Sequence, residues 1–177
     1  MKHYGIFVPY VPTSDEGKEL LAQGANMIAS EGKCWYDVVQ EVQKDKSLKY
    51  VLFMDHDNVV VHVDRTELIH TYAPTNIAVA VVEDIPDYLS TELCQWILQK
   101  DGSFIQNEAY FTAVLMGTKA DELEVANAKI SHLQDLIDIG SADSSTEAEM
   151  LKWKKYRVAL NNLNEKSKTK DLPKRPK

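Results

Sequence analysis

A change in hydrophobic period near residue 119 constrains the fold more than any other feature of this chain. Before that point, apolar residues cluster in short runs between polar turns, which is typical of strands. From Lys119 to Ile139 they recur every three or four residues, which is the spacing of one face of an α-helix. This stripe consists of Leu123, Ala126, Ile130, Leu133 and Ile137, with Leu136 widening it. The sequence therefore predicts two parts with different secondary structure.

A second helix is predicted after a short break. Gly140 can adopt the left-handed conformation that closes the first helix. Thr146 and Glu149 have the spacing of a capping box, in which each side chain satisfies a free backbone N–H. Two amphipathic helices joined by so short a link should fold into an antiparallel hairpin. We expect the structural face of the second helix to contain Trp153, Tyr156 and Leu160, together with Met150 and Leu163.

The first half is predicted to be β-rich. Residues 15–29 favour a short helix despite Gly17 and Gly24, and the turns "DHDN" and "QKDG" each separate two strand-like runs, as in β-hairpins. Strands are predicted at 3–10, 34–42, 49–54, 59–64, 76–85, 94–98 and 103–106. The expected fold class is α+β, with an N-terminal β-rich domain of antiparallel hairpins followed by a C-terminal antiparallel helical hairpin. The expected boundaries are 1–112, 113–164 and a basic, proline-containing tail at 165–177.

Charge is distributed unevenly along a chain whose composition is that of a globular protein. Residues 152–177 contain ten Lys or Arg and two acidic residues, a net charge of +8, which leaves −15 for residues 1–151. The basic end suits an acidic protein partner or solubility; it has no aromatic residue after Tyr156 on which a base could stack, so nucleic acid is not the expected partner. No apolar run is long enough to span a membrane, and residues 1–15 lack a secretory signal, so we expect synthesis in the cytoplasm.

The search for catalytic motifs favours a protein that is not an enzyme. The nucleotide-binding, metalloprotease and serine hydrolase motifs are missing from the sequence. Two cysteines, Cys34 and Cys94, form neither a CxxC pair nor a zinc pattern. The strongest metal candidate is the cluster Asp55, His56, Asp57, His62 and Asp64, the basis of a rival interpretation as a metal-dependent hydrolase. Because a turn favours Asp and Asn without any ligand, we predict no catalytic, cofactor or metal site.

Six blocks of sequence, in order, resemble the tail fibre assembly proteins of tailed bacteriophages and prophages. The end of the chain, "MLKWKKYRVALNNL" followed by "DLPKRP", is similar to the C-terminal signature of that family. Upstream, "EGKCWYDVVQEV", "YVLFMDHDNVVVHVDR", "AVVEDIP" and "WILQKDGSFIQ" follow in the family's order. The resemblance covers residues 31–176, and residues 1–30 look specific to this branch. The chain departs from the family at Leu172–Pro173, where Trp–Pro is usual, and at residues 163–165, where Val–Asp–Thr is usual.

The resemblance implies a folding helper that binds the C-terminal region of a trimeric tail fibre and assists its folding and trimerisation. It would act in the host bacterial cytoplasm during assembly. The resemblance leaves open whether the protein stays on the fibre tip, whether it self-associates, and whether it contacts host surface polysaccharide. A receptor-binding module of the fibre tip is therefore the alternative function.

The predicted partner-binding residues are three aromatic residues and three lysines, namely Trp35, Tyr36, Trp96, Lys152, Lys154 and Lys155. Trp35 and Tyr36 are neighbours on a predicted strand, so one should be buried and the other exposed. Trp96 lies in the second hairpin and could be either. The lysines should lie mostly off the face that carries Trp153.

Overall fold

The computed structural model describes residues 1–164 and 171–176 and divides the chain into two compact units, Met1–Asn107 and Glu108–Lys177. The first unit contains the strands and the second contains the two long helices, which confirms the α+β prediction. The predicted boundary after residue 112 lies inside the first long helix, whereas the two units meet at its first residue.

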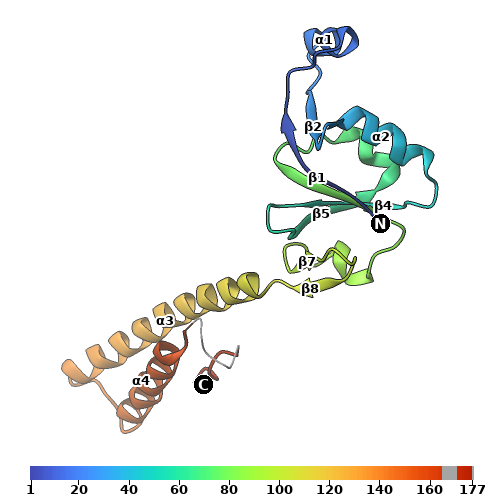
Figure 1. The fold of residues 1–177 in the computed structure, drawn as a ribbon. Coiled ribbons are helices and arrows are strands. Elements are labelled where there is room, and N and C mark those ends of the chain that lie inside the picture. The colour runs from blue at the N-terminus through green and yellow to red at the C-terminus, as the bar shows by residue number, and fades with distance from the viewer. Residues whose placement is uncertain (165–170, 177) are drawn as a thin grey trace. The chain divides into compact units, whose positions relative to one another are not determined.

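Six strands of the first unit build an antiparallel sheet in the order β3-β2-β1-β6-β4-β5. Its members are β1 (Lys2–Pro9), β2 (Ile28–Ser30), β3 (Lys33–Cys34), β4 (Tyr50–Met54), β5 (Val60–Arg65) and β6 (Ile77–Val82). Four of them, β1, β2, β4 and β5, are labelled in Figure 1. The central strands β4 and β6 are buried along almost their whole length. The long apolar run at residues 76–85 is thus explained, because a strand covered on both faces needs apolar residues at every position.

The sheet has a hydrophobic core on each face, as the alternation along β6 shows. Val79 and Val81 point into one core, together with residues of α2 (Trp35–Lys44) and η1 (Thr66–Thr71). Ala78 and Ala80 point into the other, which contains Leu89 of η2 (Asp87–Ser90). Successive side chains of a strand face opposite ways, so one strand contributes to both cores.

Both predicted hairpins are present. Strands β4 and β5 pair across the turn at 55–58, where Asn58 has a φ of 60°. Strands β7 (Trp96–Leu98) and β8 (Phe104–Gln106) pair across a turn in which Gly102 has a φ of 87°, a conformation that favours glycine. A bridge between Val59 and Ile97 joins the second hairpin to the start of β5.

The strand predicted at residues 34–42 is wrong, because residues 35–44 form helix α2. The valines of this segment favour strands by intrinsic propensity. The buried residues of α2 nevertheless have helical spacing. They lie at positions one, four, five and eight of the helix and share one face: Trp35, Val38, Val39 and Val42. Packing of that face against the sheet outweighs the local preference.

The helix predicted at residues 15–29 is shorter than expected. Helix α1 (Asp15–Ala22) begins after Ser14, whose hydroxyl accepts a hydrogen bond from the Gly17 N–H at 3.2 Å. Gly24 follows with a φ of 87°, and residues 28–30 then form strand β2. The two glycines that weakened the prediction thus lie at the two ends of the element, one inside its first turn and one beyond its last.

The second unit is an antiparallel pair of helices, α3 (Glu108–Asp138) and α4 (Thr146–Asn162). Gly140 has a φ of 72°, as predicted for the residue that closes α3. Helix α3 begins eleven residues before the predicted start at Lys119. The prediction missed these first turns because their apolar residues do not continue the stripe that faces α4. Lys119 still marks the pairing, since its Nζ donates to the Leu163 carbonyl at the end of α4 at 2.6 Å.

The cap of α4 differs from the predicted Thr146–Glu149 box. Asp143 accepts hydrogen bonds from the backbone N–H groups of Ser145 and Thr146, both at 2.9 Å. The Thr146 hydroxyl in turn accepts from the Asp143 N–H at 3.0 Å. Reciprocal bonds of the predicted kind therefore occur three residues earlier, between Asp143 and Thr146, in the turn that leads into α4, whose N-cap residue is Ser145.

Candidate partner-binding surfaces

The Trp153 face of α4 is the core of the helical unit. Trp153, Tyr156 and Leu160 are buried against Ala126 and Ile130 of α3. The two aromatic rings meet edge to face, with centroids 5.9 Å apart. The spacing of Trp153, Tyr156 and Leu160, three and then four residues, places these side chains on one side of α4. That side packs against α3 of the same chain.

The hydroxyl of Tyr156 also has an intramolecular partner. It donates to Glu122 Oε2 at 2.8 Å. Burial, reinforced by this bond to a carboxylate, raises the pKa of Tyr156 to about 12. Tyr156 is thus a neutral hydrogen-bond donor at physiological pH and fixes the register between α4 and α3.

The end of the chain lies against this same core. Leu172 packs on the cluster that contains Trp153. The Arg175 guanidinium is 3.4 Å from Glu122 Oε2 and 6.0 Å from the centre of the Trp153 ring. Within the described residues, the indole Nε1 of Trp153 is buried and has no hydrogen-bond partner. The sequence contained no periodic signal for this docking, because residues 171–176 belong to neither helix.

The predicted basic cluster lies off the Trp153 face. Lys152 and Lys155 are exposed, and Lys154 is half-buried. Each of the three lacks an ion pair in the described part of the helical unit. These ammonium groups are therefore available to an acidic partner.

A groove of about 600 Å³ lies where α3 and α4 meet the connection between them. Ile137, Met150 and Leu151 supply apolar walls, and Lys154 lines the same groove. Leu151 is 52% exposed. The groove thus joins an apolar surface to the basic cluster, a combination that the sequence pattern did not reveal.

The N-terminal turns of α3 form another apolar surface. The hydrophobic cluster of the helical unit begins at Leu123, so residues 108–118 lie outside it. Val114 is 50% exposed, while Leu115 and Met116 are half-buried. One exposed and two half-buried apolar residues in a row leave apolar area accessible to a partner. Sequence reasoning missed this surface because it placed the start of the helix at Lys119.

Trp35 and Tyr36 are consecutive residues of α2 and point about 100° apart around its axis, and only Tyr36 is accessible. Trp35 is 2% exposed; its Nε1 donates to the Tyr72 carbonyl at 2.7 Å, and its ring meets Phe7 edge to face. Tyr36 is 38% exposed. The expected division into one buried and one exposed ring is present, although a helix rather than a strand produces it.

Trp96 is half-buried and stacks on an exposed tyrosine. Its ring lies 4.3 Å from that of Tyr88, and its Nε1 donates to Glu92 at 3.1 Å. Part of the ring also packs against the core beneath the sheet. Tyr88 therefore presents more of this aromatic pair to the surface than Trp96 does, and it was not among the predicted residues.

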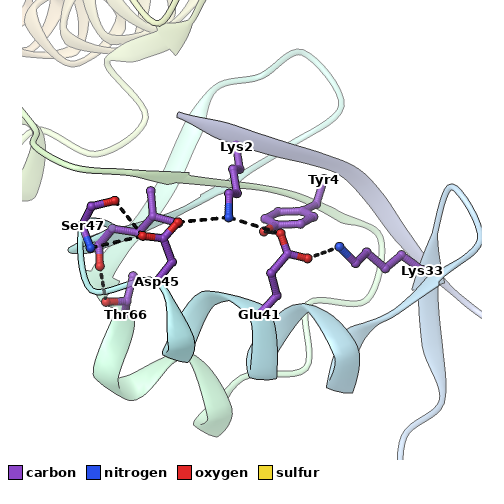
Figure 2. Close-up of polar contacts among 8 residues, drawn as sticks. Lys2, Tyr4, Lys33, Glu41, Asp45, Ser47 and Thr66 are labelled. Carbon is purple, nitrogen blue, oxygen red and sulfur yellow. Dashed lines mark hydrogen bonds and ion pairs between the residues drawn. The ribbon is translucent and has the colours of Figure 1, made fainter.

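A network of charged side chains joins α2 to β1 and β3 (Figure 2). Glu41 pairs with Lys33, lies 3.3 Å from Lys2 Nζ and accepts a hydrogen bond from the Tyr4 hydroxyl at 3.2 Å. The Lys33 ammonium holds the pKa of Glu41 below its usual value. Lys2 also donates to Asp45 at 3.1 Å. These charges satisfy one another, which indicates a structural role.

The predicted metal candidates are arranged as turn and strand residues. Asp55 Oδ1 accepts from the N–H groups of Asp57 and Val59 at 2.9 and 3.0 Å, as expected of an aspartate that closes a turn. The Tyr72 hydroxyl bridges His62 and Asp64, and its bond lowers the pKa of Asp64. In the described ranges, no three His, Cys, Asp or Glu residues come together as a metal site.

Comparison with protein families matches most of this chain to a phage family. The family model described as Caudovirales tail fibre assembly protein, lambda gpK, matches residues 63–177, which is more than half of the chain. The match begins within β5 and extends through the second hairpin, both long helices and the tail. The chain therefore belongs to this family and has a role in phage tail fibre assembly. A comparison with curated protein sequences returns no match. No helix in the described part of the chain has the length and apolar character needed to cross a membrane.

Proposed function

We propose that this protein is a folding helper that binds the C-terminal region of a trimeric phage tail fibre and promotes its folding and trimerisation. Membership of the tail fibre assembly family is the observation that carries the proposal. The helper acts by binding rather than by catalysis, in the host cytoplasm, while fibre chains are being made. Retention on the mature fibre tip is compatible with this role.

The physical need for such a helper follows from the nature of its client. Trimeric β-rich fibres depend on pairing between distant segments and between chains, and such contacts form slowly. Until they form, unpaired strand edges and apolar surface promote aggregation. A helper that covers those surfaces reversibly gives the three chains time to find their register.

The helical unit offers the chemistry that this task requires. Its groove combines apolar walls with Lys154, and Val114 on α3 adds exposed apolar surface. Lys152 and Lys155, exposed on the same helix as Lys154, add positive charge to α4. We assign fibre binding to these surfaces, in which apolar contacts supply affinity and the lysines supply orientation toward an acidic patch.

Co-expression with the cognate fibre fragment tests the function. With this protein present, the C-terminal fragment should become soluble trimer, measured by size-exclusion chromatography of the soluble fraction. Without it, the fragment should remain insoluble or monomeric. Equal trimer yield in the two cultures would contradict the chaperone role.

The role of the basic cluster has its own test. Lys152→Glu, Lys154→Glu and Lys155→Glu together should change the melting temperature little, because Lys152 and Lys155 are exposed, Lys154 is half-buried, and surface substitutions usually move stability by no more than about 0.5 kcal/mol each. Fibre capture should weaken, and high salt should weaken wild-type capture in the same way, since salt screens exposed charges.

A matched control changes the same charge elsewhere. Lys46, Lys49 and Lys100 are exposed residues of the first unit, and their joint replacement by Glu should leave fibre capture intact. If the two triple variants weakened capture equally, the effect would come from net charge rather than from this cluster.

A further inference from the structure

Residues 172–175, which we term the strap, occupy a site on the helical hairpin that has the features of a peptide-binding site. Leu172 inserts among the apolar residues around Trp153. Three positions later, Arg175 reaches both the Glu122 carboxylate and the Trp153 ring. The site thus accepts an extended segment with an apolar residue followed by a cation.

The contacts that hold the strap are few and partly open to water. Leu172 is only half-buried, and the Arg175 side chain is 50% exposed. Exposed ion pairs contribute little to stability, and a cation near a ring adds modestly when it is solvated. A competing segment therefore needs only a small advantage to replace the strap.

Trp153, against which Leu172 and Arg175 pack, has a buried hydrogen-bond donor that the strap does not use. Trp153 is 5% exposed, and among residues 1–164 and 171–176 its Nε1 has no acceptor. Leaving a buried donor unpaired is costly, whereas the neighbouring Tyr156 hydroxyl is already satisfied by Glu122. A ligand that brought a carbonyl to Trp153 Nε1 would gain a bond that the strap does not make.

We propose that the strap is a displaceable occupant of this site, and that an extended segment of the fibre, apolar and then basic, replaces it. The positive end of the segment pairs with Glu122, its apolar side chain takes the place of Leu172, and a backbone carbonyl accepts from Trp153 Nε1. This inference rests on the proposed function for the identity of the partner. The existence of the site rests on contacts within this chain.

Release of the strap in the full chain tests the site without any fibre. The double variant Leu172→Ser, Arg175→Ser should bind a fluorescein-labelled synthetic peptide covering Asp171 to Pro176, measured by anisotropy. Wild type should bind it roughly tenfold more weakly, because a site filled by its own strap most of the time loses apparent affinity in proportion. Glu122→Gln in the released background should weaken peptide binding. Lys174→Ser, a change at an exposed neighbour, should behave as wild type.

If wild type and the released variant bound the peptide equally, or if neither bound it, the inference that the strap fills a peptide-binding site would be refuted. A wild-type protein that dimerises, with the dimer lost in the released variant, would assign the site to the tail of a second copy and overturn the fibre as its occupant.

The second arm uses the purified fibre fragment. The released variant should capture it more tightly than wild type. Adding Trp153→Phe to the released variant should abolish that gain while peptide binding persists, since Phe keeps a ring but has no donor. If the peptide bound as expected but the released variant, with or without Trp153→Phe, captured the fibre fragment no better than wild type, the fibre would be refuted as the occupant. Failure of wild type to increase trimer yield in co-expression would instead refute the proposed function.

Discussion

Trp35 and Trp153 are both almost completely buried, but the two units surround them differently. Trp35 lies under one face of a sheet that is covered on both sides, and its Nε1 donates to the Tyr72 carbonyl. Trp153 lies between two helices and a short tail segment, with an indole N–H that is unpaired within the described structure. The indole N–H of Trp35 is thus hydrogen-bonded, while that of Trp153 has no acceptor among the described residues. We infer that the sheet supplies most of the stability of the fold, whereas the helical unit contains contacts that a partner could replace.

Truncation after Asn107 is expected to have the largest effect. It removes α3 and α4 and keeps the sheet with both of its cores. Circular dichroism should lose most of its helical signal and keep the strand signal, with a cooperative thermal transition. A fragment without such a transition would show that the sheet depends on the helical unit, contrary to the comparison.

Trp153→Ala is next in size. It should destabilise the helical unit by ~3–5 kcal/mol, because it removes a large apolar side chain and leaves a cavity between α3 and α4. Chemical denaturation followed by circular dichroism measures the loss. Val158→Ala, at a position of the same helix that is 57% exposed, should cost far less. Equal costs for the two variants would mean that Trp153 is not packed as described.

Replacing each tryptophan by phenylalanine isolates the difference in hydrogen bonding. Trp35→Phe loses a bond that is made, and such bonds contribute about 0.5–1.5 kcal/mol. Trp153→Phe removes a donor without a partner, so only the change in ring size should be felt. We expect Trp35→Phe to be the more destabilising of the two in denaturant titrations. The reverse order would place a partner on Trp153 Nε1.

The smallest expected effect concerns the cap of α4. Hydrogen bonds from the hydroxyls of Ser145 and Thr146, together with their N–H groups, lower the pKa of Asp143 from 3.8 to about 2. Because the folded state lowers this pKa, the contribution is present above about pH 4 and is lost as pH falls toward 2. Thermal melts across this window should show a steeper loss of helix in wild type than in Asp143→Asn. Parallel curves would exclude Asp143 as the source.

Most secondary structure could be predicted from sequence because local patterns determine it. The hairpins followed from turn residues, and the pairing of α3 with α4 followed from the stripe at Leu123 to Ile137. Helix α2 was missed because three valines favour a strand locally, while the packing that selects a helix is tertiary. The start of α3 was missed because its first turns do not share the α4-facing stripe.

The candidate site was less predictable than the fold. Patterns placed Trp153, Tyr156 and the lysines on different sides of one helix, as the structure has them. Sequence patterns could not reveal the docking of Leu172 and Arg175, which depends on contacts between residues as far apart in the chain as Glu122 and Arg175. Nor could they reveal the groove, because its walls come from both helices and their connection.

The two edge strands of the six-stranded sheet bear on the proposed function, in which the partner is rich in β-strands. At one margin, β3 is only two residues long. At the other, the start of β5 is occupied by Cys94, whose N–H donates to the Val60 carbonyl at 2.8 Å, and its remainder carries charged or titratable residues such as Asp64 and Arg65. Short or charged margins discourage the addition of further strands. Under the proposed function, such edges would let the protein bind nascent fibre chains without being incorporated into the trimer as an additional strand.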